Sequence, residues 1–214
     1  MVPEGIQMKV LLINGSPHQH GSTDLAMEET ISVLHKHGIE TELVWLGTRP
    51  IAGCIACHTC SKTGKCVFND DKVNELNARS DEFDAMIVGG PVYWGGICAQ
   101  LTAFLDRLFY SASGNWCGKP GTAIVSCRRA GNTAAYQRLL MYFGINNMPI
   151  VPSQYWNEIH GNTREQAMQD LEGRQIMRTL GENLVYMLKC RKAAEDAGVP
   201  VPEYEPRIHT NFIR

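Results

Sequence analysis

The chain has 214 residues, a formal net charge of −2 and eight cysteines, and this length accommodates one α/β domain with a full core. The nearly neutral charge, without a basic stripe, argues against a nucleic-acid-binding protein, and neither a signal peptide nor an apolar run near the ~20 residues of a membrane span is recognisable. We therefore expect a protein of the reducing cytoplasm, where clustered cysteines serve metal or redox chemistry more often than disulfides.

Short apolar runs alternate with helical segments along most of the chain. The first run, Lys9–Asn14, is continuous, as in a strand buried on both faces. Further strands are predicted over residues 41–46, 85–88, 122–126 and 148–151, and helices over residues 23–37, 70–80, 98–110, 133–143 and 164–197. Five strands alternating with helices predict a doubly wound parallel sheet.

We expect one domain over residues 1–198, followed by a proline-spaced, extended tail over residues 199–214. The tail is expected to lie on the surface or to reach a neighbouring subunit. Within the last helix, Gly173 and Gly181 predict a bend or a close packing contact, because glycine weakens a helix by roughly 1 kcal/mol relative to alanine.

Four cysteines gather between the second strand and the next helix. Cys54, Cys57, Cys60 and Cys66 follow the pattern C-x2-C-x2-C-x5-C, which is close to the ligand runs of iron–sulfur clusters. Zinc fits less well, because zinc sites usually use two pairs of ligands with a long spacer. The alternative is a loop of reduced thiols without a metal, and the spacing leaves both interpretations open.

The loop after the first strand, Asn14–Thr23, opens the first helix. Ligands of doubly wound sheets bind at such carboxyl ends of strands, and a helix N-terminus favours an anion. Ser16, Ser22 and Thr23 offer hydroxyl groups, and His18 or His20 adds a donor. Neither the P-loop nor the dinucleotide-binding pattern is present, so a terminal monophosphate is the favoured guest. Alternatively, Ser22 or Thr23 merely caps the helix.

Two later loops are expected at the same edge. In Gly90–Ile97, aromatic residues stand between glycines, so Tyr93 or Trp94 can cover a planar ring while the backbone approaches it closely. The alternative is that these aromatics cap the core. The loop Ser126–Thr133 can present backbone donors to a polar ring edge. Its Arg128 or Arg129 either neutralises an anion or is solvated surface charge.

The segments GSPHQHGST and GGPVYWGGICAQLTAFLDR resemble the NAD(P)H-dependent FMN reductase superfamily over about residues 8–155. The resemblance implies a flavodoxin-like, five-stranded parallel sheet with helices on both faces, and FMN as the cofactor. By position, it implies a phosphate site at Ser16, His18, Ser22 and Thr23. It implies a flavin site at Pro91, Val92, Tyr93, Trp94, Gly95 and Gly96 and, more weakly, at Ser126, Arg128 and Gly131. Many relatives carry arginine in the phosphate loop where this chain has histidine, which leaves more of the binding to neutral donors.

The cysteine spacing is similar to that of the iron–sulfur flavoproteins within this superfamily. That similarity implies a [4Fe–4S] cluster on Cys54, Cys57, Cys60 and Cys66, although cysteine-rich loops also occur in plain flavin reductases. The implied function is an FMN-dependent oxidoreductase that passes electrons from NADPH or NADH to a small-molecule or protein acceptor, as a homodimer or homotetramer. No catalytic side chain is expected, because the flavin carries the chemistry. The alternatives are an electron carrier without small-molecule turnover and a zinc-stabilised scaffold.

Overall fold

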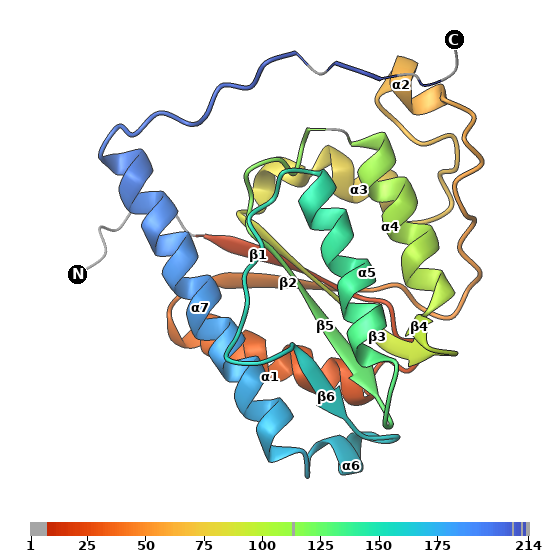
Figure 1. Cartoon of the computed structure of the whole chain (residues 1–214), viewed down its shortest axis with the longest axis vertical. Coiled ribbons are helices and arrows are strands. Elements are labelled where there is room, and N and C mark those ends of the chain that lie inside the picture. Colours follow the sequence, from red (N-terminus) through yellow and green to blue (C-terminus); the bar gives the residue numbers. More distant parts are fainter. Residues whose placement is uncertain (1–7, 113, 207, 211, 213–214) are drawn as a thin grey trace.

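Five parallel strands lie side by side at the centre of the molecule, between two layers of helices (Figure 1). The structure, a computed structural model, describes residues 8–112, 114–206, 208–210 and 212. Its strands are β1 (Lys9–Asn14), β2 (Glu40–Trp45), β3 (Ala85–Tyr93), β4 (Gly96–Ile97), β5 (Gly121–Cys127) and β6 (Glu158–His160). Its helices are α1 (Ser22–Lys36), α2 (Thr59–Thr63), α3 (Val73–Ala78), α4 (Ala99–Ser111), α5 (Asn132–Ile145), α6 (Arg164–Ala167) and α7 (Leu171–Asp196), and a 3₁₀ turn, η1, covers Ser80–Glu82.

The strand order confirms the predicted doubly wound sheet. Neighbouring parallel strands follow the order β2–β1–β3–β5–β6, while β4 folds back antiparallel on β3. The winding therefore reverses between β1 and β3, which is where sheets of this kind hold their ligands.

Side chains that alternate along the strands build two separate cores. Val10 and Leu12 of β1 pack toward α1 and α7, whereas Leu11 and Ile13 pack toward α3, α4 and α5. This alternation follows from the two-residue period of a strand, which sends successive side chains to opposite faces. Helices on both faces of the sheet are thus confirmed.

The predicted strand at residues 148–151 is wrong, because the fifth parallel strand is β6 at Glu158–His160. Ile150 makes only an isolated bridge to Gly121. Its neighbours Pro149 and Pro152 lack the N–H groups that a strand ladder uses. The edge of β5 is therefore covered in two pieces, by residue 150 near its start and by β6 near its end.

The predicted helix over residues 164–197 is also wrong as a single element. It is divided into α6 and α7, because the side chain of Asp170 accepts a hydrogen bond from the Gly173 N–H and caps a new helix. The predicted close packing is confirmed at Gly181, where an added Cβ would lie 2.8 Å from the Cβ of Val33 on α1. The division between a domain and a tail at residues 198 and 199 stays a prediction.

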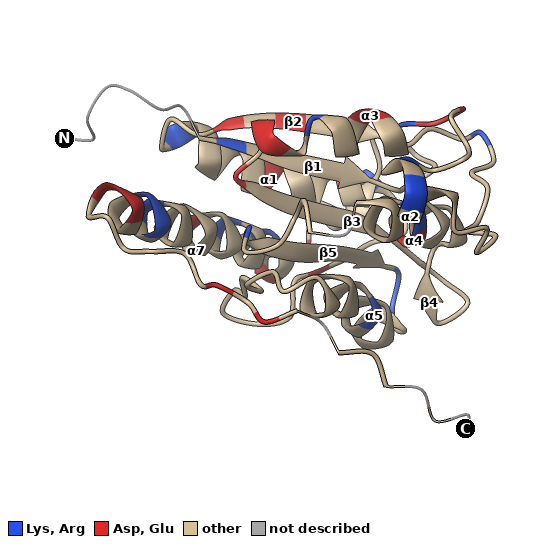
Figure 2. Cartoon of the chain, turned by 90° about the horizontal axis from the view of Figure 1, so that it is seen from above, with Lys and Arg blue, Asp and Glu red and all other residues tan. Residues whose placement is uncertain are grey.

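The segment that carries the four predicted metal ligands runs outside the sheet. It leaves β2, passes beside α4 and includes the short helix α2, which packs on α4 (Figure 1). Lys and Arg are interspersed with Asp and Glu along the ribbon in Figure 2, which fits the absence of a basic stripe in the sequence. Among the described helices, none is both long enough and apolar enough to cross a bilayer.

Candidate functional site

Four loops meet at the carboxyl edge of the sheet and line one open cleft. They include or directly follow the carboxyl ends of β1, β3, β5 and β6, and they contribute residues 18–22, 91–93, 126–128 and 161–165. The sequence predicted three of these loops, and the structure brings all three together. The predicted residues that line the cleft are His18, Ser22, Pro91, Val92, Tyr93, Ser126 and Arg128.

Ser16 shapes the first loop instead of facing the cleft. Its side chain is 4% exposed, and its Oγ accepts a hydrogen bond from the His18 N–H at 3.2 Å. Its carbonyl oxygen accepts the indole N–H of Trp45 at 2.7 Å. The hydroxyl and carbonyl of Ser16 therefore hold the loop in position, and the residue contributes to the cleft through the loop's shape.

The N-terminus of α1 opens toward this cleft at Gly21 and Ser22. No side chain caps the helix at Gly21, so the alternative in which Ser22 or Thr23 serves as the cap is wrong. The Ser22 hydroxyl instead bonds the carbonyls of Gly161 and Thr163, and Thr23 Oγ1 lies 2.8 Å from Ser126 Oγ. The uncapped first turn leaves backbone N–H groups free for an anion.

Asp24, in the same first turn, is buried beneath the loop. Its carboxylate accepts a hydrogen bond from Asn14 Nδ2 at 3.3 Å, and His20 Nδ1 lies 3.4 Å from it. Burial raises the pKa of Asp24. Asp24 is thus held beneath the loop by its contacts with Asn14 and His20.

The second predicted loop is a tight hairpin. β3 continues past the predicted end of its strand to Tyr93, and Trp94 and Gly95 form the turn to Gly96 of β4. Both turn residues have positive φ, +51° at Trp94 and +79° at Gly95. This is the φ pattern of a type I′ turn, which normally carries Asn-Gly. Trp94 is held at a steric cost with its side chain fully exposed beside the cleft, so it does not cap the core.

The third loop joins the hairpin through Gly131. With φ at +87°, Gly131 approaches the hairpin so closely that an added Cβ would lie 2.9 Å from both Gly95 Cα and Val92 Cγ1. The Cys127 thiol lines the cleft between this loop and β6, and burial raises its pKa to about 11. Cys127 is thus a neutral wall of the cleft at physiological pH.

The fourth loop, residues 161–165, was missed because β6 was placed too early. Its Thr163 caps α6 by accepting a hydrogen bond from the Gln166 N–H, and Gln166 Oε1 accepts from the Asn162 N–H. This Thr-x-x-Gln pattern is the helix-start signal that could have revealed it. The loop brings Arg164 to the cleft, where its guanidinium pairs with Glu28 and lies 3.9 Å from Asp24.

The four predicted metal ligands line a second hollow, on the outer side of α4. Cys54, Cys57, Cys60 and Cys66 share it with the apolar side chains of Ile55, Val67 and Phe68 and with Arg107 and Tyr110 of α4. In the described part of the chain, no group of three or more His, Cys, Asp or Glu side chains is arranged to hold a metal ion. The thiols thus share one hollow, and gathering them around a metal requires the segment to close.

The backbone of this segment departs from its preferred conformations. Ala56 and His58 adopt φ values of +50° and +56°, a region that costs a non-glycine residue about 1–2 kcal/mol. The Cys57 thiol is exposed, and its hydrogen bond with Thr59 Oγ1 lowers its pKa. This hollow and the cleft share no lining residue, and Arg107 lies about 12 Å along α4 from its first residue, Ala99, at ~1.5 Å per residue.

Solved structures with the same fold share little sequence with this chain. RosB with bound 8-demethyl-8-formylriboflavin-5′-phosphate superposes with a TM-score of 0.68 at 15% identity, over 97% of this chain and 94% of that one. A flavodoxin from the domain Archaea gives a TM-score of 0.56 at 16% identity, over 85% of this chain and 99% of that one. Both likenesses confirm a flavodoxin-like fold.

Sequence comparisons are more specific. The model of the NADPH-dependent FMN reductase family matches residues 8–163. An iron–sulfur flavoprotein of Methanocaldococcus jannaschii is 32% identical over 86% of this chain and all of that protein. One from Archaeoglobus fulgidus is 34% identical over 64% of each chain, and one from Methanosarcina thermophila is 28% identical over 88% of this chain and all of that protein. The chain therefore belongs to the NADPH-dependent FMN reductase family, in its iron–sulfur flavoprotein branch.

Proposed function

We propose that this protein is an FMN-dependent oxidoreductase that takes electrons from NADPH or NADH and passes them to a small-molecule or protein acceptor. The observation that carries the proposal is the cleft at the β1/β3 reversal, where an uncapped helix N-terminus and a glycine-bounded aromatic hairpin converge. The bound flavin would supply the hydride chemistry, while the protein binds the cofactor, orients it and excludes water.

The first turn of α1 would hold the FMN phosphate, with Ser22 and the loop shaped by Ser16. His18 lines the same end of the cleft, and Arg164 brings a guanidinium there although the first loop has no arginine. The hairpin from Pro91 to Gly96 and the loop with Ser126, Arg128 and Gly131 would contact the ribityl chain and the ring.

Substitution at Ser22 tests where the phosphate lies. Ser22→Asp places a carboxylate at the first position of α1, which favours the helix through its dipole but repels a phosphate. We expect at least a tenfold loss of FMN affinity relative to the neutral control Ser22→Asn, and no difference between the two variants for riboflavin, which lacks the phosphate. Equal FMN affinity of both variants, measured by titration of flavin fluorescence, would show that the phosphate binds elsewhere.

A reduction assay tests whether the protein is an enzyme. Anaerobic addition of NADPH or NADH to the FMN-loaded protein should bleach the flavin absorbance within one turnover, and an added quinone should restore it. The relatives that are named iron–sulfur flavoproteins favour, as a second candidate, an electron carrier without small-molecule turnover. Failure of both nicotinamides to bleach the flavin, with reduction by a protein donor, would establish the carrier.

A [4Fe–4S] cluster would be held by Cys54, Cys57, Cys60 and Cys66. It would add a one-electron centre to the two-electron flavin. The donor set fits, because four free thiols line one hollow with apolar walls. Anaerobic reconstitution should give close to four irons and four labile sulfides per chain. Less than one iron would rule out the cluster, and zinc without iron would favour the zinc-stabilised scaffold.

A homodimer or homotetramer is the proposed assembly. The support from this chain is the exposed Trp94 at the hairpin tip, with Tyr155 and Trp156 more than half exposed, since exposed aromatic side chains are typical of interfaces. Light scattering after size-exclusion chromatography should give a mass of two or four chains. A monomer at micromolar concentration would overturn this assembly.

A further inference from the structure

Arg107 of α4 is buried against the cysteine segment. Its side chain is 1% exposed, and all of its recorded side-chain hydrogen bonds go to residues 52–71. Nε lies 3.2 Å from Cys66 Sγ, Nη1 lies 3.3 Å from the Ala52 carbonyl, and Nη2 lies 3.3 Å from the Phe68 carbonyl. The carboxylate of Asp71 pairs with Nη1. A helix residue is thus the common anchor for both ends of the segment.

The acceptor that faces Arg107 Nε is a sulfur atom, the Sγ of Cys66. A buried guanidinium is stable only when its charge is paired and its N–H groups find acceptors. Asp71 supplies the charge, and two carbonyls accept Nη donors. Nε is directed at Cys66 Sγ, although a neutral thiol is a weak acceptor. An anionic thiolate, as in a metal ligand, makes the same contact a charge-assisted hydrogen bond.

Cys66 is also held through its main chain, by a side chain of α3. The side chain of Asn74 accepts from the Cys66 N–H at 2.8 Å and donates to the Cys66 carbonyl at 3.0 Å. Cys54 and Cys57, in contrast, are exposed. Cys66 is thus positioned before a metal arrives. Cys60 is held less closely, by α2 and by a 3.9 Å contact of its Sγ with the Tyr110 carbonyl, while the exposed Cys54 and Cys57 can close onto them.

We propose that Arg107 is a positioning residue for the metal centre. Arg107 fixes Cys66 as the first ligand of this centre and raises the reduction potential of the centre. The inference rests on the cluster of the proposed function. A hydrogen bond to a ligand sulfur withdraws negative charge from the centre, so it favours the reduced form.

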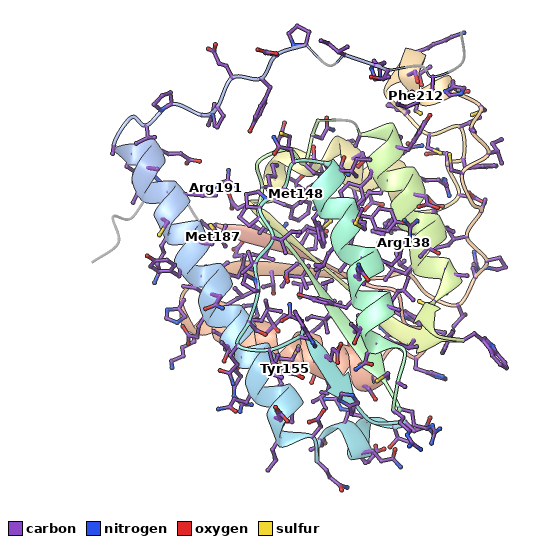
Figure 3. All side chains as sticks on the ribbon, viewed as in Figure 1. Arg138, Met148, Tyr155, Met187, Arg191 and Phe212 are labelled. Carbon is purple, nitrogen blue, oxygen red and sulfur yellow. The ribbon has the colours of Figure 1, made fainter. Side chains whose placement is uncertain are left out.

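The test compares Arg107→Lys and Arg107→Met with Arg138→Lys and Arg138→Met. Arg138 is the matched control, because it lies on α5 beside α4 (Figure 3) and contacts Asp106 and Tyr142 without reaching the cysteine segment. Each variant is reconstituted anaerobically. Iron and sulfide are counted, the midpoint potential of the centre is taken from a titration followed by electron paramagnetic resonance, and bound FMN reports on the fold.

We expect Arg107→Lys to keep its charge beside Asp71 and most of its iron, but to lower the midpoint potential. Arg107→Met should lose more than half of the iron while FMN binding stays unchanged. Both Arg138 variants should match the wild type in iron content and potential. Loss of bound FMN would show that Arg107→Met does not fold. In that case the inference is tested by the iron content and midpoint potential of Arg107→Lys.

Two results overturn the inference, and they are distinguishable. A wild-type protein without iron removes the cluster of the proposed function and the role of Arg107 with it. A wild-type protein that is loaded, together with an Arg107→Lys variant of unchanged iron content and potential, removes only the role of Arg107.

Discussion

The cleft at the sheet edge and the hollow under the cysteine segment are built in different ways. The cleft is formed by loops that leave adjacent parallel strands, so its shape follows from the sheet and from one helix N-terminus. The hollow lies outside the sheet, and side chains such as Arg107 and Asn74 hold its segment in place. A site of the first kind is largely formed without its ligand, whereas one of the second kind depends on its ligand for completion.

Because the cleft and the hollow are built from different contacts, we expect the two regions to respond independently to substitution. Changes at the loop contacts should alter flavin binding and stability and leave the iron content unchanged. Changes at the contacts of the cysteine segment should do the reverse.

The largest effect is expected for Gly131→Ala. The positive φ costs alanine about 1–2 kcal/mol, and its Cβ would meet Gly95 and Val92 at 2.9 Å. We expect a loss of about 2–3 kcal/mol in the free energy of unfolding, measured with urea, together with weaker FMN binding. The iron content should not change. A reduced iron content would show that the cleft and the cysteine hollow are coupled.

Gly144→Ala is the matched control, on α5, the helix that Gly131 directly precedes. An added Cβ there meets nothing within 4 Å, so alanine should stabilise the protein by about 0.5–1 kcal/mol. If both substitutions lower the unfolding free energy by similar amounts, the loss comes from placing alanine at either end of α5 and not from the contact between Gly131 and the hairpin.

Thr23→Val should have a smaller effect. It removes the 2.8 Å hydrogen bond between Thr23 Oγ1 and Ser126 Oγ, both buried, and leaves the Ser126 hydroxyl without this partner. We expect about 1–3 kcal/mol of destabilisation and weaker FMN binding, because the bond joins the first and third loops. Thr102→Val, which removes a hydroxyl bonded within α4 to Ala99, serves as control and should change stability by less than ~0.5 kcal/mol.

Glu42→Gln should have the smallest effect and should change neither flavin nor iron binding. Arg79 donates two hydrogen bonds to Glu42 and Lys9 a third, and they lower the pKa of Glu42 to about 2 from 4.5. The lowered pKa stabilises the folded state above pH 4.5, and this contribution is lost as pH falls toward about 2. Because solvent screens the pair, we expect about 1 kcal/mol at pH 7.

Urea unfolding of the wild type and Glu42→Gln at several pH values checks this prediction. The difference in unfolding free energy should be constant from pH 5 to 7 and shrink below pH 4.5. A difference that does not depend on pH would mean that the variant acts by packing.

The sequence predicted the sheet and three of the four loops because both have local signals. Continuous apolar runs such as Lys9–Asn14 mark buried strands, and glycines mark the turns that follow. It failed where tertiary contacts decide. Met148–Val151 is apolar enough for a strand, but Pro149 within it and Pro152 directly after it prevent a ladder, while β6 contains the polar residues Glu158 and His160.

The candidate site shows the same division. His18, Ser22 and Tyr93 were predicted to face a ligand, and they line the cleft. Ser16 and Thr23 were also predicted to face a ligand, but they instead hold the loops together. Arg107 follows an aspartate on an amphipathic helix, and nothing in its neighbourhood along the chain indicates that it is buried beside Cys66. Only the path of the cysteine segment, which is set by contacts distant in sequence, reveals that relation.

The two edges of the sheet also bear on aggregation. An exposed strand edge can pair with another chain, and proteins prevent this with very short edge strands or with charge. β6 covers only Glu158–His160, so it offers little length for an added strand. β2 is longer, and its Glu40 and Glu42, the latter held by Lys9 and Arg79, place charge along that edge. Resistance to edge-to-edge association thus rests on length at one side of the sheet and on charge at the other.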